Sequence, residues 1–308
     1  MNTHAQSIYL DPRLGQMHQV MLGDRTRLEA YDKALARDVR PGDVVVDVGA
    51  GCLALTLLAL RHGAGHVYAI EGDPATARIA GAILADNGIA DRVTIVEGDA
   101  RTVSLPRRAD VLVSEMLGNI GPEEEMGEIL AICAERHLKP GGAIIPQRLA
   151  TVINAIRFDG ESWGVWSDDL AGYSLAAARP FLGSSAQLHF FARPPELLSE
   201  TTALAAIDLG QPPGALPEHC DIDIIRPGRL DALALAFVAD FGDGIRLSNF
   251  PGYPGCNWAV FIWPLSSSQV AAGDVLRVSI RPGTWVRDAL SWQIDCGIRR
   301  STQRDLQP

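Results

Sequence analysis

Residues 44–51 read VVVDVGAG, a mostly β-branched run that ends in a glycine turn. The next stretch, CLALTLLALRHG (52–63), is apolar and has the length of a helix. A buried strand, a tight turn and a helix in this order open a βαβ unit, the building block of parallel sheets. The sequence therefore predicts an α/β fold from this stretch outward.

The same alternation continues up to about Pro146. Asp73 and Pro74 have the form of a helix N-cap followed by proline at the first helical position, and Asn87 with the next glycine supplies a stop. A third helix is predicted over 123–138, before a Lys-Pro-Gly-Gly turn. The predicted strands are HVYAIE (66–71), RVTIVEGD (92–99), ADVLVSE (109–115) and GAIIP (142–146). Short connections between these elements favour a parallel, doubly wound sheet.

After Gln147 the chain consists of short segments rich in β-branched and aromatic residues, separated by Gly, Pro and Asp. This pattern predicts a mostly antiparallel β-sandwich or barrel over 148–308, with one short helix within LAGYSLAAA (170–178). The segments are TVINAIRF (151–158), LALAFVADF (233–241), NWAVFIWPL (257–265), DVLRVSIRP (274–282) and ALSWQID (289–295).

Length and charge bound the class of protein. The 308 residues are enough for about two domains. The 27 Lys and Arg against 37 Asp and Glu give a net charge of −10, which argues against a nucleic-acid partner and favours cationic ligands. Five scattered cysteines without a CxxC pair predict neither a metal site nor a disulfide framework, and so a reducing compartment. The chain has no signal-like start and no long apolar run, so we expect a cytoplasmic protein without membrane contact.

The glycine turn has the spacing of a nucleotide site. Gly49 and Gly51 let the backbone approach a ligand, and Glu71 comes 20 residues after Gly51, where a carboxylate can accept ribose hydroxyls. Gly72 follows Glu71 directly. The alternative is a purely structural turn, and GAGCLA also fits a dinucleotide site.

Two further positions favour S-adenosylmethionine over a nicotinamide. Asp47 would repel a pyrophosphate but could contact an ammonium group through water or the turn. Asp99 and Ala100, at the end of the third strand, are placed to meet an adenine edge.

A second cluster is acidic. Residues 114–126 read SEMLGNIGPEEEM, so Glu115 ends an apolar strand and three glutamates follow a loop with two glycines and a proline. Carboxylates set close together favour a cation between them, and a planar guanidinium matches them best. For the triplet the simpler interpretation is favourable charge in the first turn of a helix.

At this point the sequence resembles the protein arginine methyltransferases, from about residue 8 to about 295. The resemblance rests on VDVGAG, on Glu71, and on Glu115 and Glu124 spaced nine apart. It also rests on HQVMLGDRTR (18–27) with Tyr31, on the start of an N-terminal tyrosine motif at Tyr9, and on Trp258 in a Thr-His-Trp-like loop. The resemblance implies a Rossmann-like class I methyltransferase sheet followed by a β-barrel-like domain.

The resemblance also assigns roles and domains. It implies that Glu115 and Glu124 are catalytic, that Arg27 pairs with the methionine carboxylate of the cofactor, and that His18 and Met21 line the cavity. It implies a helical cofactor lid over 1–40, a cofactor domain over 41–147, a substrate and dimerisation domain over 148–308, and a homodimer. The substrate-binding residues that it implies are Tyr9, Met126, Asn257 and Trp258.

Three positions depart from the family pattern. Leu53 stands where the turn has its third glycine, which would tighten the pocket or shift the helix. Arg13 replaces a tyrosine, and Asn257 replaces the histidine that would pair with Asp24, so a charged partner is lost. These changes leave the acceptor open: an arginine that is free, in a peptide or in a protein, or another cationic metabolite.

Simpler interpretations remain for single residues. His18 could be a structural histidine. Trp258, Met21 and Met126 could be core residues. Arg27 could be only a surface partner of Asp24. The favoured function is methyl transfer from S-adenosylmethionine to a guanidino nitrogen of arginine. The alternatives are a methyltransferase for another nitrogen, oxygen or carbon, an NAD-dependent oxidoreductase, and an inactive binding protein.

Overall fold

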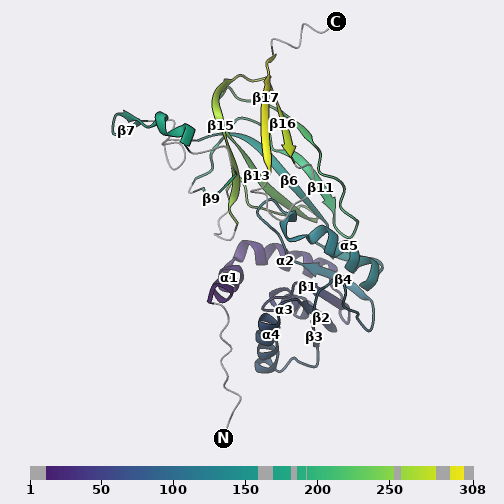
Figure 1. Ribbon diagram of the computed structural model, residues 1–308. Coiled ribbons are helices and arrows are strands. Elements are labelled where there is room, and N and C mark those ends of the chain that lie inside the picture. The colour runs from purple at the N-terminus through teal and green to yellow at the C-terminus, as the bar shows by residue number, and fades with distance from the viewer. Residues whose placement is uncertain are drawn as a thin grey trace.

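The structure is a computed structural model that describes residues 12–158, 169–181, 186–191, 193–252, 258–281 and 292–301. It has a parallel α/β half and an antiparallel β half, drawn below and above in Figure 1. Among the described residues no helix is both long and apolar enough to cross a membrane.

The first half is built on a five-stranded parallel sheet with the strand order β3-β2-β1-β4-β5. Its strands are β1 (Val44–Val48), β2 (His66–Glu71), β3 (Val93–Glu97), β4 (Ala109–Ser114) and β5 (Leu138–Ile145). The order reverses at β1, so the carboxyl ends of β1 and β4 meet at a switch point, where such sheets bind ligands. Val48 lies between Ile70 and Ser114 in this register, as the predicted doubly wound sheet requires.

The local signals for the helices of this half are confirmed in α4 (Pro74–Asn87). The Asp73 carboxylate accepts the backbone N–H of Thr76 at 2.7 Å, and Gly88 ends the helix in the left-handed region at φ 63°. Helix α3 (Ala54–Arg61) follows the glycine turn. The apolar stretch after VVVDVGAG thus forms the predicted strand–turn–helix unit.

The predicted helix over 123–138 is wrong at its start. Pro122–Glu124 form a short 3-10 turn, η1, and Glu125 then turns left-handed at φ 59° before α5 (Met126–His137) begins. Glu123 and Glu124 therefore do not stand in the first turn of an α-helix, so a favourable helix dipole does not explain them. The Lys-Pro-Gly-Gly stretch is not a separate turn either, because β5 already begins at Leu138.

The second half is antiparallel, as predicted. Seven strands form one sheet: β6 (Arg148–Arg157), β9 (Gln187–His189), β10 (Glu196–Leu197), β11 (Thr202–Asp208), β13 (Gly228–Gly242), β14 (Ile245–Ser248) and β15 (Val260–Val270). Three more form a second sheet: β12 (His219–Asp223), β16 (Val275–Arg281) and β17 (Gln293–Arg299). Residues such as Leu233, Trp263 and Val278 form one core from both sheets. No pairing among the described strands joins the sheets, so closure into a barrel stays a prediction.

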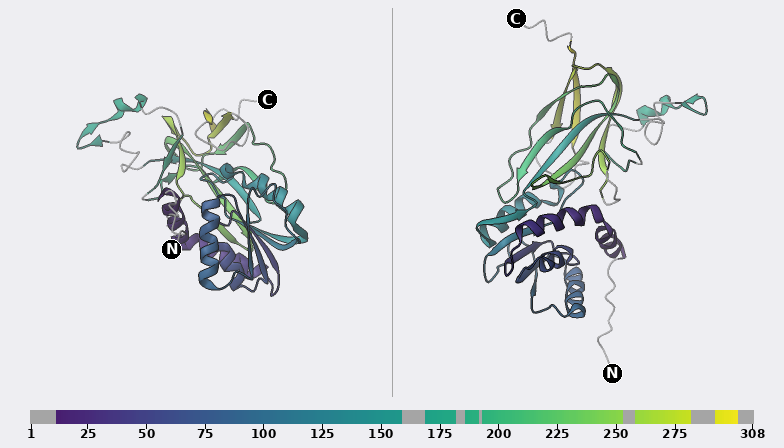
Figure 2. Two further views of the ribbon diagram at one scale, coloured as in Figure 1. Left: turned by 60° about the horizontal axis from the view of Figure 1, so that its bottom comes forward. Right: turned by 180° about the vertical axis from the view of Figure 1, so that it is seen from behind.

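One segment projects from the antiparallel half (Figures 1 and 2). It contains β7 (Asp169–Leu170), β8 (Tyr173–Ser174) and a 3-10 turn, η3 (Ala176–Phe181). The short helix predicted near this place is therefore a hairpin followed by a 3-10 turn.

Two helices precede the parallel sheet, α1 (Pro12–Gly23) and α2 (Arg25–Asp38), and α2 lies between the two halves in Figures 1 and 2. Tyr31 is fully buried, its ring meets Phe241 edge-on at 4.8 Å, and its hydroxyl donates to the Ser114 carbonyl at 2.9 Å. Helix α2 is thus part of the core and connects β4 to β13.

Candidate active site

The glycine turn after β1 shapes the floor of a cavity. Gly49 and Gly51 have φ values of 73° and 52°, which L side chains rarely adopt. The Gly51 amide donates to the Glu71 carboxylate at 2.8 Å. A Cβ on Gly51 would lie 3.2 Å from the His18 ring, so a side chain there would press into the cavity.

The departure at Leu53 has a local explanation. Leu53 takes the left-handed conformation, φ 68°, just before α3, and its side chain is fully buried in the core. It is not among the residues that line the cavity. The expectation that Leu53 narrows the pocket is therefore wrong. Its side chain fills the core, and its backbone adopts a conformation that is strained for a residue other than glycine.

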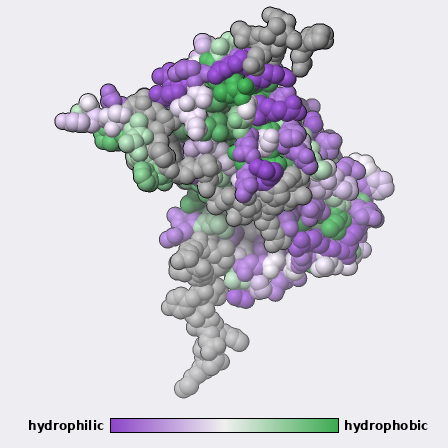
Figure 3. Space-filling view, turned by 45° about the horizontal axis from the view of Figure 1, so that its top comes forward, coloured by the Kyte–Doolittle hydropathy of each residue, from purple (hydrophilic) through white to green (hydrophobic). Residues whose placement is uncertain are grey.

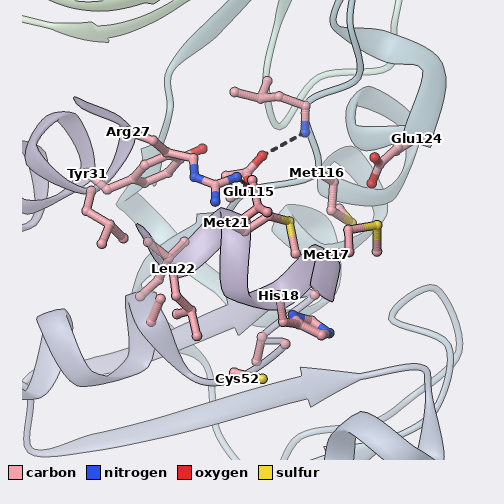
Figure 4. A pocket seen from close by; sticks show the side chains of 18 of the residues that line it. Met17, His18, Met21, Leu22, Arg27, Tyr31, Cys52, Glu115, Met116 and Glu124 are labelled. Atoms are coloured by element: carbon pink, nitrogen blue, oxygen red, sulfur yellow. Dashed lines mark hydrogen bonds and ion pairs between the residues drawn. The ribbon is translucent and has the colours of Figure 1, made fainter. Parts of the chain in front are cut away.

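The cavity has a volume of about 770 Å³ and is lined from α1, α2, the glycine turn, the end of β2 and the loop after β4 (Figure 4). This size suits a cofactor-sized ligand. The structure brings together here most of the predicted site residues: His18, Met21, Arg27, Gly49, Gly51, Glu71, Gly72, Glu115, Glu124 and Trp258.

Four predicted residues do not line the cavity. Asp47 is fully buried, where Oδ2 accepts the Thr56 hydroxyl at 2.7 Å and Oδ1 has no hydrogen-bond partner among the described residues. Burial raises the pKa of Asp47 to about 7. Asp99 is turned toward the Arg101 guanidinium at 2.8 Å, and Ala100 presents its carbonyl to Cys133. Met126 is fully buried in the core.

Two predicted residues, Tyr9 and Asn257, lie outside the described residues, as does the side chain of Arg13. Their assignments stay predictions.

The buried end of the cavity is an ion pair. The Arg27 guanidinium lies 2.6 Å from a Glu115 carboxylate oxygen, and the other oxygen accepts the Leu117 N–H at 3.1 Å. Burial raises the pKa of Glu115, which the positive charge of Arg27 opposes. Arg27 is only 4% exposed, so the interpretation of Arg27 as a surface partner of Asp24 is wrong.

Trp258 closes this end. Its ring lies 5.2 Å from the Arg27 guanidinium carbon, a cation–π distance, and its indole N–H donates to the Leu117 carbonyl at 2.8 Å. Trp258 is both core and cavity wall, since it is 7% exposed and also lines the pocket.

The three consecutive glutamates have three different roles. Glu123 turns into its own loop, where it accepts the Ile120 N–H at 2.8 Å, and Glu125 pairs with Arg101 at 3.2 Å. Glu124 alone lines the cavity. Partial removal from water inside the cavity and the like charges of Glu115 and Glu123 raise its pKa to about 7, although the residue as a whole is still exposed.

Sequence reasoning missed two methionines of the cavity, Met17 and Met116, which Figure 4 shows near Glu124. Met17 lies one turn before Met21, so helical spacing could have placed both on one face. Met116 follows Glu115 at the carboxyl end of β4, where ligand contacts are expected. The side of the cavity near Glu124 is therefore lined with flexible, polarisable thioethers.

Known proteins resemble this chain in sequence and in fold. Residues 45–142 match the family described as a methyltransferase domain. An arginine N(omega)-methyltransferase of Streptomyces achromogenes subsp. streptozoticus is 32% identical over 291 residues, which cover 85% of this chain and 75% of that protein. Protein arginine N-methyltransferase 1 of Chlamydomonas reinhardtii is 25% identical over 94% of this chain and 83% of its own length. A probable protein arginine N-methyltransferase 6.1 of Oryza sativa subsp. indica is 33% identical over 170 residues. This match covers 53% of this chain and 44% of that relative.

Solved structures share the fold. Protein arginine methyltransferase 10 of Arabidopsis thaliana superposes with a TM-score of 0.75 at 21% identity, over 92% of this chain and 93% of that one. A Trypanosoma brucei enzyme–prozyme heterotetrameric complex with AdoHcy gives a TM-score of 0.73 at 21% identity, over 92% and 98%. Together with the long match to the Streptomyces protein, these findings show that the chain belongs to the arginine methyltransferase family of class I methyltransferases.

Proposed function

We propose that this protein transfers a methyl group from S-adenosylmethionine to a guanidino nitrogen of an arginine substrate. The observation that carries the proposal is the meeting of Glu115 and Glu124 in the cavity that contains the glycine turn. A nicotinamide enzyme would not need this pair of carboxylates. Family membership supports the same reaction.

The cavity residues fit an adenosyl cofactor. The left-handed glycines leave a cradle that a Cβ at either position would enter, 3.2 Å from Met116 or from His18. Glu71, at the rim of this cradle, uses its oxygens to accept the amides of Gly51 and Asp73, and each oxygen keeps a further lone pair for a ribose hydroxyl. Arg27 supplies a positive charge for the carboxylate of the cofactor.

When bound, S-adenosylmethionine supplies a methyl group on a positively charged sulfur, which is a good leaving group. The protein then has to orient the acceptor and keep a lone pair on the attacking nitrogen. Glu115 and Glu124 would bind the guanidinium and draw positive charge from the attacking nitrogen. They would accept its proton directly or through water. Free deprotonation of arginine at neutral pH is excluded by its high pKa, so this charge withdrawal is required.

The raised pKa of Glu124 predicts a pH dependence. A protonated carboxyl group cannot draw charge from a guanidinium, so kcat/KM for the acceptor should fall about tenfold per pH unit below about 7 and level off above it. Kinetics of the wild type from pH 5.5 to 9 would show this limb. The control is Asp47→Asn, because the pKa of Asp47 is also about 7. This variant should show the same fall of kcat/KM below pH 7 as the wild type. If the fall disappears, Asp47 and not Glu124 is the group that titrates.

The proposed function is tested with the purified protein and a panel of acceptors. Free arginine, arginine-containing peptides and histone-like proteins are offered with labelled S-adenosylmethionine, and products are identified by mass spectrometry. Methylation at a guanidino nitrogen is expected, and the same spectra show whether dimethylation is symmetric. Displacement of S-adenosylhomocysteine by NAD, or methylation at another atom only, would support one of the alternatives.

We also propose a homodimer. The projecting segment exposes Leu170, Tyr173 and Phe181, and Figure 3 shows hydrophobic surface along it. Val20 and Leu22 of helix α1 line the cavity and are also partly exposed, so a partner subunit could cover this apolar rim. Sedimentation velocity, which shows whether one chain or two sediment together, tests the proposed homodimer.

The domain division into 1–40, 41–147 and 148–308 is likewise proposed. The boundary near 147 is supported by the change from parallel to antiparallel pairing between β5 and β6. A cytoplasmic location is proposed from the thiols of Cys52, Cys133, Cys220 and Cys296, which are free.

A further inference from the structure

The loop between β4 and α5 contains a carboxylate that faces neither solvent nor substrate. Glu123 Oε1 accepts the Ile120 N–H at 2.8 Å. Burial raises the pKa of Glu123, and the amides of Ile120, Asn119, Gly121 and Glu123 itself oppose this by stabilising the charged form. Oε2 is buried and has no hydrogen-bond partner among the described residues. Successive amides that converge on an anion form a nest, and here the anion comes from the same loop.

The loop is shaped around this carboxylate. Gly118 and Gly121 exchange two backbone hydrogen bonds, 3.0 and 3.2 Å long, which close a small ring. A Cβ on Gly118 would collide with the Glu123 carboxylate, so only glycine leaves it room.

The antiparallel half holds the outside of the same loop. Thr151 donates its hydroxyl to the Ile120 carbonyl at 2.7 Å, and Asn249 donates its amide to the Asn119 carbonyl at 2.8 Å. The loop is thus fixed from outside by the neighbouring sheet and from inside by Glu123. The residue that follows directly, Glu124, is the one whose carboxylate lines the cavity.

We infer that Glu123 is a positioning residue that fixes the direction of Glu124 toward the acceptor by filling the amide nest of its own loop. The inference rests on the proposed function, since it assigns a task to Glu123 in that reaction. A buried carboxylate is a costly way to fill space, and an apolar side chain would fill it at lower cost. A carboxylate is useful here because Oε1 accepts the Ile120 N–H while its charge interacts with the neighbouring amides of the loop, and both effects favour one backbone conformation.

The test compares Glu123→Ala, Glu123→Gln and Gly118→Ala with the matched controls Glu128→Ala and Glu128→Gln. Glu128 is exposed in the first turn of α5 and lies outside the cavity. Calorimetry measures S-adenosylhomocysteine affinity, steady-state kinetics gives kcat and KM for the acceptor, and hydrogen exchange reports the amides of residues 118–121 and 123. The Glu123 and Glu128 variants should bind S-adenosylhomocysteine like the wild type, because neither residue lines the cavity and the glycine turn is untouched. Gly118 lines the cavity, so Gly118→Ala is judged by kcat and hydrogen exchange.

Glu123→Ala should lower kcat about 10- to 100-fold and raise KM for the acceptor, since small misplacements of a catalytic group have effects of this size. Exchange of the Ile120 amide should rise at least about tenfold. Gly118→Ala displaces the same carboxylate and should give the same pattern. Glu123→Gln keeps an oxygen for Ile120 and should recover part of kcat, whereas the Glu128 variants should change neither readout.

Unchanged kcat and KM in Glu123→Ala, in a protein that binds the cofactor analogue normally, would overturn the inference. So would a loss of cofactor affinity equal to the loss of kcat, because that indicates general destabilisation. If the wild type methylates no guanidine, the proposed function fails. Hydrogen exchange then still decides whether Glu123 fixes the loop.

Discussion

Replacing Glu115 by glutamine is expected to lower kcat about 10³-fold while S-adenosylhomocysteine binding persists. The amide keeps the size of the side chain and can still accept the Leu117 N–H. It carries no negative charge, so it can neither draw charge from a guanidinium nor accept its proton, and general acid–base and electrostatic effects of this kind are worth about 10² to 10⁴ in rate. Single-turnover kinetics with saturating cofactor measures the effect on the chemical step.

The control for this substitution is Glu128→Gln, which removes the same charge from an exposed helix position and should leave the rate unchanged. A Glu115→Gln protein that binds the cofactor analogue and turns over at the wild-type rate would contradict the assignment of Glu115 as a catalytic residue.

Replacing Arg27 by methionine is expected to lower the free energy of unfolding by about 3 kcal/mol at pH 8. The substitution leaves Glu115 as a buried charge without its partner, and breaking buried pairs in this way costs about 3–5 kcal/mol. It also removes the cation above Trp258. Denaturant unfolding at several pH values measures the effect.

The pH dependence of this loss follows from Glu115. Its pKa in the folded state is already raised by burial, and without Arg27 it should rise further. The folded variant then holds a proton more tightly than the unfolded chain. The destabilisation should therefore be small near pH 5 and grow as pH rises above the pKa of the unfolded glutamate. The double variant Arg27→Met with Glu115→Gln should be more stable at pH 8 than Arg27→Met alone, and an equal or larger loss in the double variant would show that the pair is not coupled.

The parts of this protein that sequence predicts well are those set by local rules. The bounds of β1 follow from an unbroken apolar run, and those of α4 from Asp73, Pro74 and Gly88, each of which acts on neighbouring backbone atoms. The carboxyl ends of neighbouring parallel strands must meet at one edge of the sheet. This rule predicts a shared site, and the structure has one cavity lined by Gly49, Gly51, Glu71 and Glu115.

The parts that sequence predicted poorly depend on contacts between distant segments. Local rules do not distinguish the three consecutive glutamates, and only the family spacing from Glu115 singled out Glu124 for the cavity. The contacts of Glu123 with its own loop and of Glu125 with Arg101 were not predicted, because loop closure and the neighbouring sheet decide them. Met126 resembles a cavity residue in sequence but is turned into the core by the left-handed backbone at Glu125. Asp99 was assigned to the ligand and instead meets Arg101, two residues away.

The loop between β4 and α5 accepts hydrogen bonds from Thr151, Asn249 and Trp258, which are all synthesised after it. The order of synthesis therefore affects when this loop becomes fixed. A ribosome completes the strands of the parallel sheet by residue 145, well before Trp258 emerges. Because amino-terminal units generally fold first, the nascent chain can form its cofactor cradle while the loop with Glu115 and Glu124 is not yet held on its outer side. The hydrogen bond from Trp258 to this loop can therefore form only after about one hundred further residues have been synthesised.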